Sequence, residues 1–366
     1  MLAQDLARPR DSAAQIRVMV VDDSAIVRGL ITRSLKSDPR IEVVASCSNG
    51  EMAVTQAARR SLDIIILDIE MPVMDGLTAL PKLQRANAGA RIIMASTLTQ
   101  RNAAISLRAM ALGAADYIAK PTTDRLNASE EFHRDLIRKV IALGQARRPR
   151  QSADASSCPP AIPHIAVRGG MVRQPRIIAI GSSTGGPQAL LALLGALSPA
   201  VGCPIVIAQH MPATFTTVLA QHIERASQRP TSEAADGMEI KPGRIYLAPG
   251  DYHFEVARNG AGHIARLSQT PPQNFCRPSV DPLFHSVAQL FGADSCAVML
   301  TGMGSDGCGG ARAIAAAGAP VIAQDEATSV VWGMPGAVAQ AGICSAILPL
   351  PKIAGHLAAL FERAAA

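Results

Sequence analysis

Residues 176–191 read RIIAIGSSTGGPQALL, and this stretch decides the fold of the second half of the chain. Its apolar run, Ile177–Ile180, has the length of a buried strand. A glycine-rich turn follows, and Pro187 then opens an Ala/Leu-rich segment that is typical of a helix. Such a turn presents one side chain beside the unbonded N–H groups of the helix start. The turn matches G-x-S-x-G, so Ser183 is a candidate nucleophile, and the alternative is a turn that only joins strand to helix.

Composition limits the classes of protein that need consideration. The 366 residues exceed what one hydrophobic core normally serves, which predicts two or three domains. Aromatic residues make up 3% of the chain, which argues against base-stacking surfaces for nucleic acid. The seven cysteines form no C-x-x-C pair, so the sequence is consistent with a reducing compartment and has no zinc-binding pattern. No stretch has the apolar length of a membrane span, and we expect a cytoplasmic protein without membrane insertion.

The first 140 residues alternate apolar runs with helical patterns. Expected strands cover 16–21, 41–46, 64–67, 91–95 and 117–119, and expected helices cover 25–35, 50–60, 77–86, a segment through 110, and 124–145. This alternation predicts a doubly wound α/β domain with a parallel sheet. Ligands of such sheets bind beyond the C-terminal ends of the strands.

Residues suited to phosphoryl chemistry stand at those strand ends. They are Asp22, Asp23, Asp68, Ser96 and Lys120. Converging carboxylates repel one another unless a cation neutralises them, and Mg²⁺ prefers such oxygen ligands. Asp68 would then accept a phosphoryl group as an acyl phosphate, and Lys120 would contact that group.

Three motifs in this half carry a resemblance to a known family. VVDDS at 20–24, LDIEMPVMDG at 67–76 and YIAKP at 117–121 resemble the receiver domain of two-component response regulators. The resemblance covers about 16–140 and implies a flavodoxin-like fold. It also implies phosphorylation of Asp68 by a histidine kinase.

The same resemblance implies roles for further residues. Mg²⁺ would be held by Asp23, Asp68 and the Glu70 carbonyl, with Asp22 acting through water. The Ser96 hydroxyl would sense the phosphoryl group, with Thr97 as the alternative register, and Tyr117 would be the aromatic residue that moves with it.

A linker and a second α/β domain follow. Residues 145–174 are rich in Pro, Ser, Gly and Arg and show no periodicity, which predicts a flexible linker. From 175 to 366, expected strands cover 177–180, 204–208, 244–248, 253–256, 264–267, 296–300 and 321–323, and expected helices follow Pro187 and cover 215–226, 282–291, 309–318 and 355–363. Ser183, His210 and Asp306 each follow an expected strand, so one crevice can hold all three.

These three side chains form a candidate set for nucleophilic catalysis. A histidine takes the proton of an attacking serine, and a buried carboxylate orients that histidine. The glycine-rich turns at 181–186 and 302–304 are candidate sources of oxyanion donors. Spacing leaves three rival bases open, namely His222, His253 and His285.

A second resemblance covers this half of the chain. The blocks GSSTGG (181–186), AQHMP (208–212), LAPGDYH (247–253), RPSVDPLF (277–284), LTGMGSDG (300–307) and QDEATSVVWGMP (324–335) resemble the catalytic domain of the CheB family of chemotaxis methylesterases. The family implies a Rossmann-like domain without a cofactor. It implies Ser183 as nucleophile, His210 as base, Asp306 as orienting acid and the Met303 N–H as an oxyanion donor. Its substrates would be methyl esters, and also glutamines, on chemoreceptor helices.

Two other functions stay open at this point. A receiver with a DNA-binding output would use the net charge of +6, although no helix-turn-helix pattern is present. Residues 181–186 could instead bind a nucleotide phosphate, but they match neither the G-x-G-x-x-G nor the G-x-x-x-x-G-K-[ST] spacing.

Overall fold

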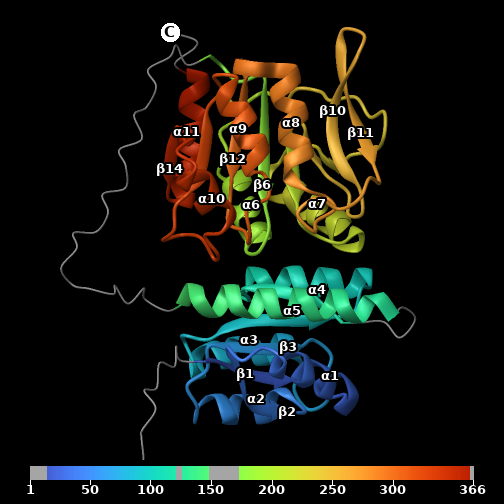
Figure 1. Ribbon diagram of the computed structural model, residues 1–366, viewed down its shortest axis with the longest axis vertical. Coiled ribbons are helices and arrows are strands. Elements are labelled where there is room, and N and C mark those ends of the chain that lie inside the picture. Colours follow the sequence, from blue (N-terminus) through green and yellow to red (C-terminus); the bar gives the residue numbers. More distant parts are fainter. Residues whose placement is uncertain (1–14, 121–125, 148–172, 363–366) are drawn as a thin grey trace, which may run out of the picture. The chain divides into compact units, whose positions relative to one another are not determined.

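The computed structural model describes residues 15–120, 126–147 and 173–362. The expected linker at 145–174 lies almost entirely outside the described residues. The chain divides into two compact units, which are 1–95 with 121–147, and 96–120 with 148–366. Two parallel sheets carry the two halves of the sequence (Figure 1).

The first sheet has five strands in the order β2-β1-β3-β4-β5. Its strands are β1 (Ile16–Val21), β2 (Ile41–Cys47), β3 (Ile64–Asp68), β4 (Arg91–Ser96) and β5 (Asp116–Ala119). Strands β1 and β3 lie side by side with Val18 opposite Ile64. This is the flavodoxin-like order, and its switch point lies between β1 and β3. Because β3 is buried along its whole length, its apolar run has no polar alternation.

Short polar side chains fix where the helices of this half begin. Ser24, Asn49, Asp75 and Thr99 each accept a hydrogen bond from a backbone N–H of the first turn that follows. The helices are α1 (Ala25–Lys36), α2 (Gly50–Ala57), α3 (Gly76–Ala86), α4 (Gln100–Ala111) and α5 (Leu126–Arg147).

The second sheet has seven strands in the order β14-β13-β12-β6-β7-β9-β8, and every neighbouring pair is parallel. The strands are β6 (Ile177–Ser182), β7 (Ile205–Gln209), β8 (Thr231–Glu233), β9 (Ile245–Leu247), β12 (Ser295–Met299), β13 (Val321–Gln324) and β14 (Ala346–Leu348). From β6 the chain adds β7, β8 and β9 on one side of that strand, and then β12, β13 and β14 on the other side. The switch point therefore lies between β6 and β12, where α/β sheets bind ligands.

Helices cover both faces of this sheet. They are α6 (Gly186–Gly195), α7 (Ala213–Ser227), α8 (Val280–Phe291), α9 (Cys308–Ala316), α10 (Met334–Gln340) and α11 (Leu350–Glu362). Helices α8 and α9 pack together and lie in front of β6 and β12 in Figure 1. Their apolar side chains share one core with the sheet, in which Val280, Phe284 and Met299 are fully buried.

The structure confirms most of the elements that the sequence predicts, and the differences have local causes. The expected strands at 253–256 and 264–267 pair as an antiparallel hairpin of β10 (His253–Asn259) and β11 (Gly262–Ser268), separate from the parallel sheet. The sequence prediction omitted β8 and β14, which have three residues each, and α10, which contains Pro335 and Gly336. Helix α11 begins at Leu350 rather than at the expected Gly355.

Candidate functional site

Ser183 directly follows β6 at the switch point of the second sheet. Its backbone N–H donates to the Thr301 carbonyl at 3.0 Å, and its carbonyl accepts from Gly186 at 2.7 Å. Gly185 has φ +75°, a conformation that a residue with a Cβ rarely adopts. The turn thereby fixes the Ser183 backbone, while the Ser183 hydroxyl makes no hydrogen bond to the described residues.

His210 and Asp306 form a buried pair beyond the ends of β7 and β12. The Nε2 atom of His210 lies 2.7 Å from Oδ2 of Asp306. Both side chains are at least nine-tenths buried, so water screens their attraction little. A carboxylate in this position fixes the ring orientation and leaves Nδ1 as the nitrogen that can accept a proton.

Three further donors hold the Asp306 carboxylate. Oδ1 accepts from the Ser279 hydroxyl at 2.7 Å and from the Asn274 amide at 2.8 Å. Oδ2 accepts from the Val280 backbone N–H at 2.6 Å. With His210 the carboxylate thus has four partners, which satisfies a buried charge.

The charges of this pair shift both pKa values. Burial by itself would raise the pKa of Asp306, but the hydrogen bond and charge of His210, with the Val280 and Ser279 donors, hold it well below its usual range. Burial by itself would lower the pKa of His210. The charge of Cys276 and the bonds to Asp306 and Cys276 outweigh burial and raise the pKa of His210 to about 10. The imidazolium is therefore strongly stabilised.

Gln209 ties the two halves of the site together. Its amide nitrogen donates to the Ser183 carbonyl at 2.9 Å and to the His210 carbonyl at 3.1 Å. Its amide oxygen accepts from the Ser182 hydroxyl at 2.6 Å. One fully buried side chain therefore fixes the backbone of both predicted catalytic residues.

The loop after β12 approaches Ser183 closely. A Cβ on Gly302 would lie 2.8 Å from Ser183 Cβ and 2.4 Å from Met334 Sδ, so only glycine fits there. The next residue, Met303, is buried, and its N–H makes no hydrogen bond to any residue in the described ranges. An unbonded N–H beside the serine suits the predicted oxyanion donor.

The rival bases occupy other environments. Both ring nitrogens of the buried His253 have backbone partners, since Nδ1 accepts from the Ser279 N–H and Nε2 lies 3.2 Å from the Pro271 carbonyl. His285 is exposed on α8. His222 is half-buried on α7, where burial and Arg225 lower its pKa. None of the three contacts a buried carboxylate in the part of the chain described.

The structure brings His210 and Asp306 into contact but gives no hydrogen bond between Ser183 and His210 among the described residues. The Sγ atom of Cys276 instead lies 3.3 Å from His210 Nδ1. Sequence reasoning missed Cys276, Asn274, Ser279 and Gln209. The last three carry no chemistry of their own, and their role depends on contacts between segments far apart in the sequence.

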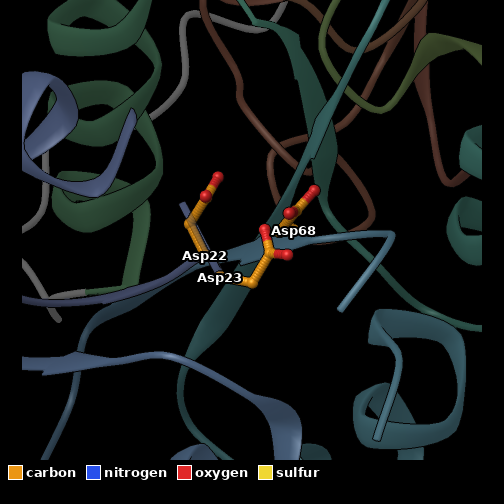
Figure 2. Close-up of side chains that lie close together, drawn as sticks. All are labelled: Asp22, Asp23 and Asp68. Carbon is orange, nitrogen blue, oxygen red and sulfur yellow. The ribbon is translucent and has the colours of Figure 1, made fainter. Parts of the chain in front are cut away.

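The acidic residues of the first half also converge. Ligand atoms of Asp22, Asp23 and Asp68 lie within 4.8 Å of one another at the ends of β1 and β3 (Figure 2). Asp22 and Asp68 are buried, and the N–H of Ile69 donates to Asp68 at 2.7 Å. Three carboxylates at this spacing are the hard oxygen donors that Mg²⁺ prefers, so the residues present fit that ion.

The other predicted receiver residues occupy the expected elements. Ser96 ends β4 and is buried, and its hydroxyl donates to the Thr97 carbonyl at 3.1 Å. Tyr117 is buried on β5, and the Lys120 N–H donates to the Ser96 carbonyl at 2.7 Å. Glu70 is exposed just beyond β3. Their roles toward a phosphoryl group stay predictions.

Comparisons with known proteins define first a class and then a family. The response regulator receiver domain family matches residues 18–129, and the CheB methylesterase family matches residues 178–357. The chain is thus a response regulator with an enzymatic output domain. It belongs to the CheB family of protein-glutamate methylesterases/protein-glutamine glutaminases. This membership leaves the DNA-binding and nucleotide-cradle interpretations without support.

The relatives extend over nearly the whole chain. A protein-glutamate methylesterase/protein-glutamine glutaminase 1 of Paramagnetospirillum magneticum is 52% identical, covering 97% of this chain and 98% of its own. The protein of that name from Rhodospirillum rubrum is 53% identical, with 93% and 94% covered. The Thermotoga maritima CheB catalytic domain is 40% identical, covers 51% of this chain and 99% of its own, and superposes with a TM-score of 0.50.

These matches confirm both resemblances and the fold class. Within the described ranges, no helix has the length and apolar character that a membrane crossing requires.

Proposed function

We propose that this chain hydrolyses glutamate γ-methyl esters on chemoreceptor helices, with Ser183 as nucleophile, His210 as base and Asp306 as orienting acid. The 2.7 Å contact between His210 and Asp306, beside the serine-bearing turn at the sheet's switch point, carries the proposal. The names of the relatives support the substrate class.

The reaction follows from the residues around Ser183. As the Ser183 oxygen attacks the ester carbonyl, its proton passes to His210 Nδ1, the nitrogen that does not face Asp306. The Met303 N–H donates to the oxyanion of the tetrahedral intermediate. Methanol leaves with the proton from His210, and an ester on Ser183 remains. Water, deprotonated by His210, cleaves that ester and frees a glutamate carboxylate.

Glutamine side chains enter the same sequence of steps. Ammonia leaves in place of methanol, and water again releases glutamate from Ser183. The relatives' second name, glutaminase, supports this activity. One site therefore serves two leaving groups.

The first half of the chain controls the second. The domains are a receiver at 16–140, a linker at 145–174 and a catalytic domain at 175–366. Asp68 accepts the phosphoryl group of a chemotaxis histidine kinase in the cytoplasm. Asp22, Asp23, Asp68 and the Glu70 carbonyl would hold Mg²⁺, which neutralises the converging carboxylates during transfer. The matched receiver family and the acid cluster support this scheme.

Three residues would respond to phosphorylation. Lys120 pairs with the phosphoryl oxygens, the Ser96 hydroxyl donates to one of them, and Tyr117 changes position with Ser96. The phosphorylated state favours an open catalytic site, a population shift between two conformations. We expect no cofactor in the catalytic domain.

The test uses the two adjacent serines of the turn. Methanol release from methyl-labelled receptor membranes is measured for the full chain, Ser183→Ala and Ser182→Ala, with and without a small phosphodonor and Mg²⁺. Ser183→Ala should lower the rate at least ~10⁴-fold. Ser182→Ala, which removes only the bond to Gln209, should keep most activity. A Ser183→Ala variant that still releases methanol at the wild-type rate would overturn the proposal.

A further inference from the structure

The thiol of Cys276 contacts the predicted catalytic histidine directly. Its Sγ atom lies 3.3 Å from His210 Nδ1, and Asp306 lies 2.7 Å from Nε2. Both ring nitrogens therefore have an acidic partner. The thiol therefore contacts Nδ1, which is the nitrogen that should accept the Ser183 proton.

A tight turn holds the thiol in this place. Gln273 and Cys276 exchange two backbone hydrogen bonds of 3.1 and 2.8 Å across Asn274 and Phe275. Both central residues have positive φ, +52° and +63°, which is unfavourable for side chains with a Cβ. The Asn274 amide donates to Asp306, so the turn is tied to the carboxylate that orients His210.

The charged groups near His210 are few. Asp306 comes from the loop after β12, and Cys276 comes from the turn after β11. Arg277 follows Cys276, but its guanidinium pairs with Asp251 at 2.6 Å. His253 bonds to the backbone of Ser279 and Pro271. Within the described residues, only Asp306 and Cys276 contact the imidazole, and both stabilise its protonated form.

We propose that Cys276 is a positioning residue for the hydrolysis: it shares one proton with His210 Nδ1 in the resting enzyme and determines when that nitrogen can act on Ser183. The inference rests on the proposed function, because it takes His210 as the base. While the shared proton is on the ring, Nδ1 cannot accept another proton. When it is on sulfur, the imidazole is neutral, and its Nδ1 lone pair can accept the Ser183 proton.

Two variants separate this role from simple packing. Cys276→Ser keeps a small polar group that cannot ionise near neutral pH, and Cys276→Ala removes the polar group. In the full chain, ¹⁵N and ¹³C NMR follows the His210 ring, which is assigned by its absence in His210→Gln. Both Cys276 variants should lower the His210 titration midpoint by at least ~1 pH unit, because each removes the partner of Nδ1 that raises the pKa of His210.

Cys308→Ala is the matched control. Cys308 has similar burial in the same domain, and its thiol contacts the Ala337 carbonyl rather than His210. This variant should leave the midpoint unchanged. An identical midpoint in the wild type, Cys276→Ser and Cys276→Ala would overturn the inference.

The pH profile of methanol release gives a second measurement. The acidic limb of kcat/KM should move to lower pH by the same amount in both Cys276 variants, a gain of about tenfold at a pH on that limb. A role in packing alone would lower the rate at every pH and leave the limb in place, which would also overturn the inference. If His210→Gln stayed fully active while the midpoint moved, the proposed function would fail and the Cys276–His210 pair would stand.

Discussion

Asp306→Asn tests how the carboxylate acts on His210. The change keeps the shape of the side chain, removes its charge and turns one oxygen into an amide NH₂. On the Oδ2 side the partners are the Val280 backbone N–H, which can only donate, and His210. On the Oδ1 side, the Ser279 hydroxyl can reverse and accept, whereas the Asn274 amide nitrogen also donates to Asp281 and stays a donor. The new NH₂ should therefore face Ser279, because the Oδ2 side offers two donors and no group that can reverse.

This orientation sets the size of the effect. The amide oxygen still accepts from His210 Nε2, so the ring keeps the tautomer in which Nδ1 is the base. The loss is the difference between a charged and a neutral hydrogen bond, plus the attraction to the developing imidazolium. Together these amount to about 2–4 kcal/mol at an effective dielectric constant near ~20. At 1.36 kcal/mol per decade, kcat should fall ~30- to ~900-fold.

The assay is methanol release at saturating methylated receptor, with circular dichroism to confirm the fold. Asp281→Asn is the control, because its carboxylate accepts from Gly310 and Asn274 without contacting His210. It should change kcat only a few-fold. A loss of ~10⁴ or more in Asp306→Asn would mean that the tautomer reverses. An unchanged kcat would mean that the charge does not act on His210, and either result would refute the reasoning.

Three further changes test other parts of the account. Asp68→Asn should abolish stimulation of methanol release by phosphodonor and Mg²⁺, because it removes the acceptor carboxylate, and persisting stimulation would contradict the receiver scheme. Gly302→Ala should cost at least ~10²-fold in kcat, since its Cβ would lie 2.8 Å from Ser183 Cβ, whereas Gly355→Ala, with open space around it, should keep full activity. The raised pKa of His210 should stabilise the fold fully below its unfolded value of 6.5, and this contribution should disappear as pH rises through about 10. In urea unfolding, the wild type should therefore lose its advantage over His210→Gln between those pH values, and a constant advantage would be inconsistent with the shift.

The alternation of apolar runs and helical patterns predicted both sheets because several buried strands lead to a glycine turn or a polar helix cap. The run Ile64–Leu67 and the cap Asp75 are local signals of this kind. The three-residue strands β8 and β14 carry too few residues for any periodicity. They exist because neighbouring strands offer hydrogen bonds.

The candidate site likewise contains residues that the sequence could locate and residues that it could not. Asp22, Asp68, His210 and Asp306 stand where strands end, so topology alone places them at a sheet edge. Cys276 follows no parallel strand of the sheet, and a turn between distant segments brings it to His210. Sequence reasoning follows the ends of strands well, but contacts made by long loops depend on tertiary packing.

The most direct test of the central claim is covalent labelling of the nucleophile. The full chain is treated with a fluorophosphonate that reacts with activated serines, digested, and mapped by mass spectrometry while methanol release is followed. The account predicts one adduct, on Ser183, formed in proportion to the loss of activity and absent in His210→Gln. Inactivation with the adduct on Ser182, or on Cys276, would contradict it.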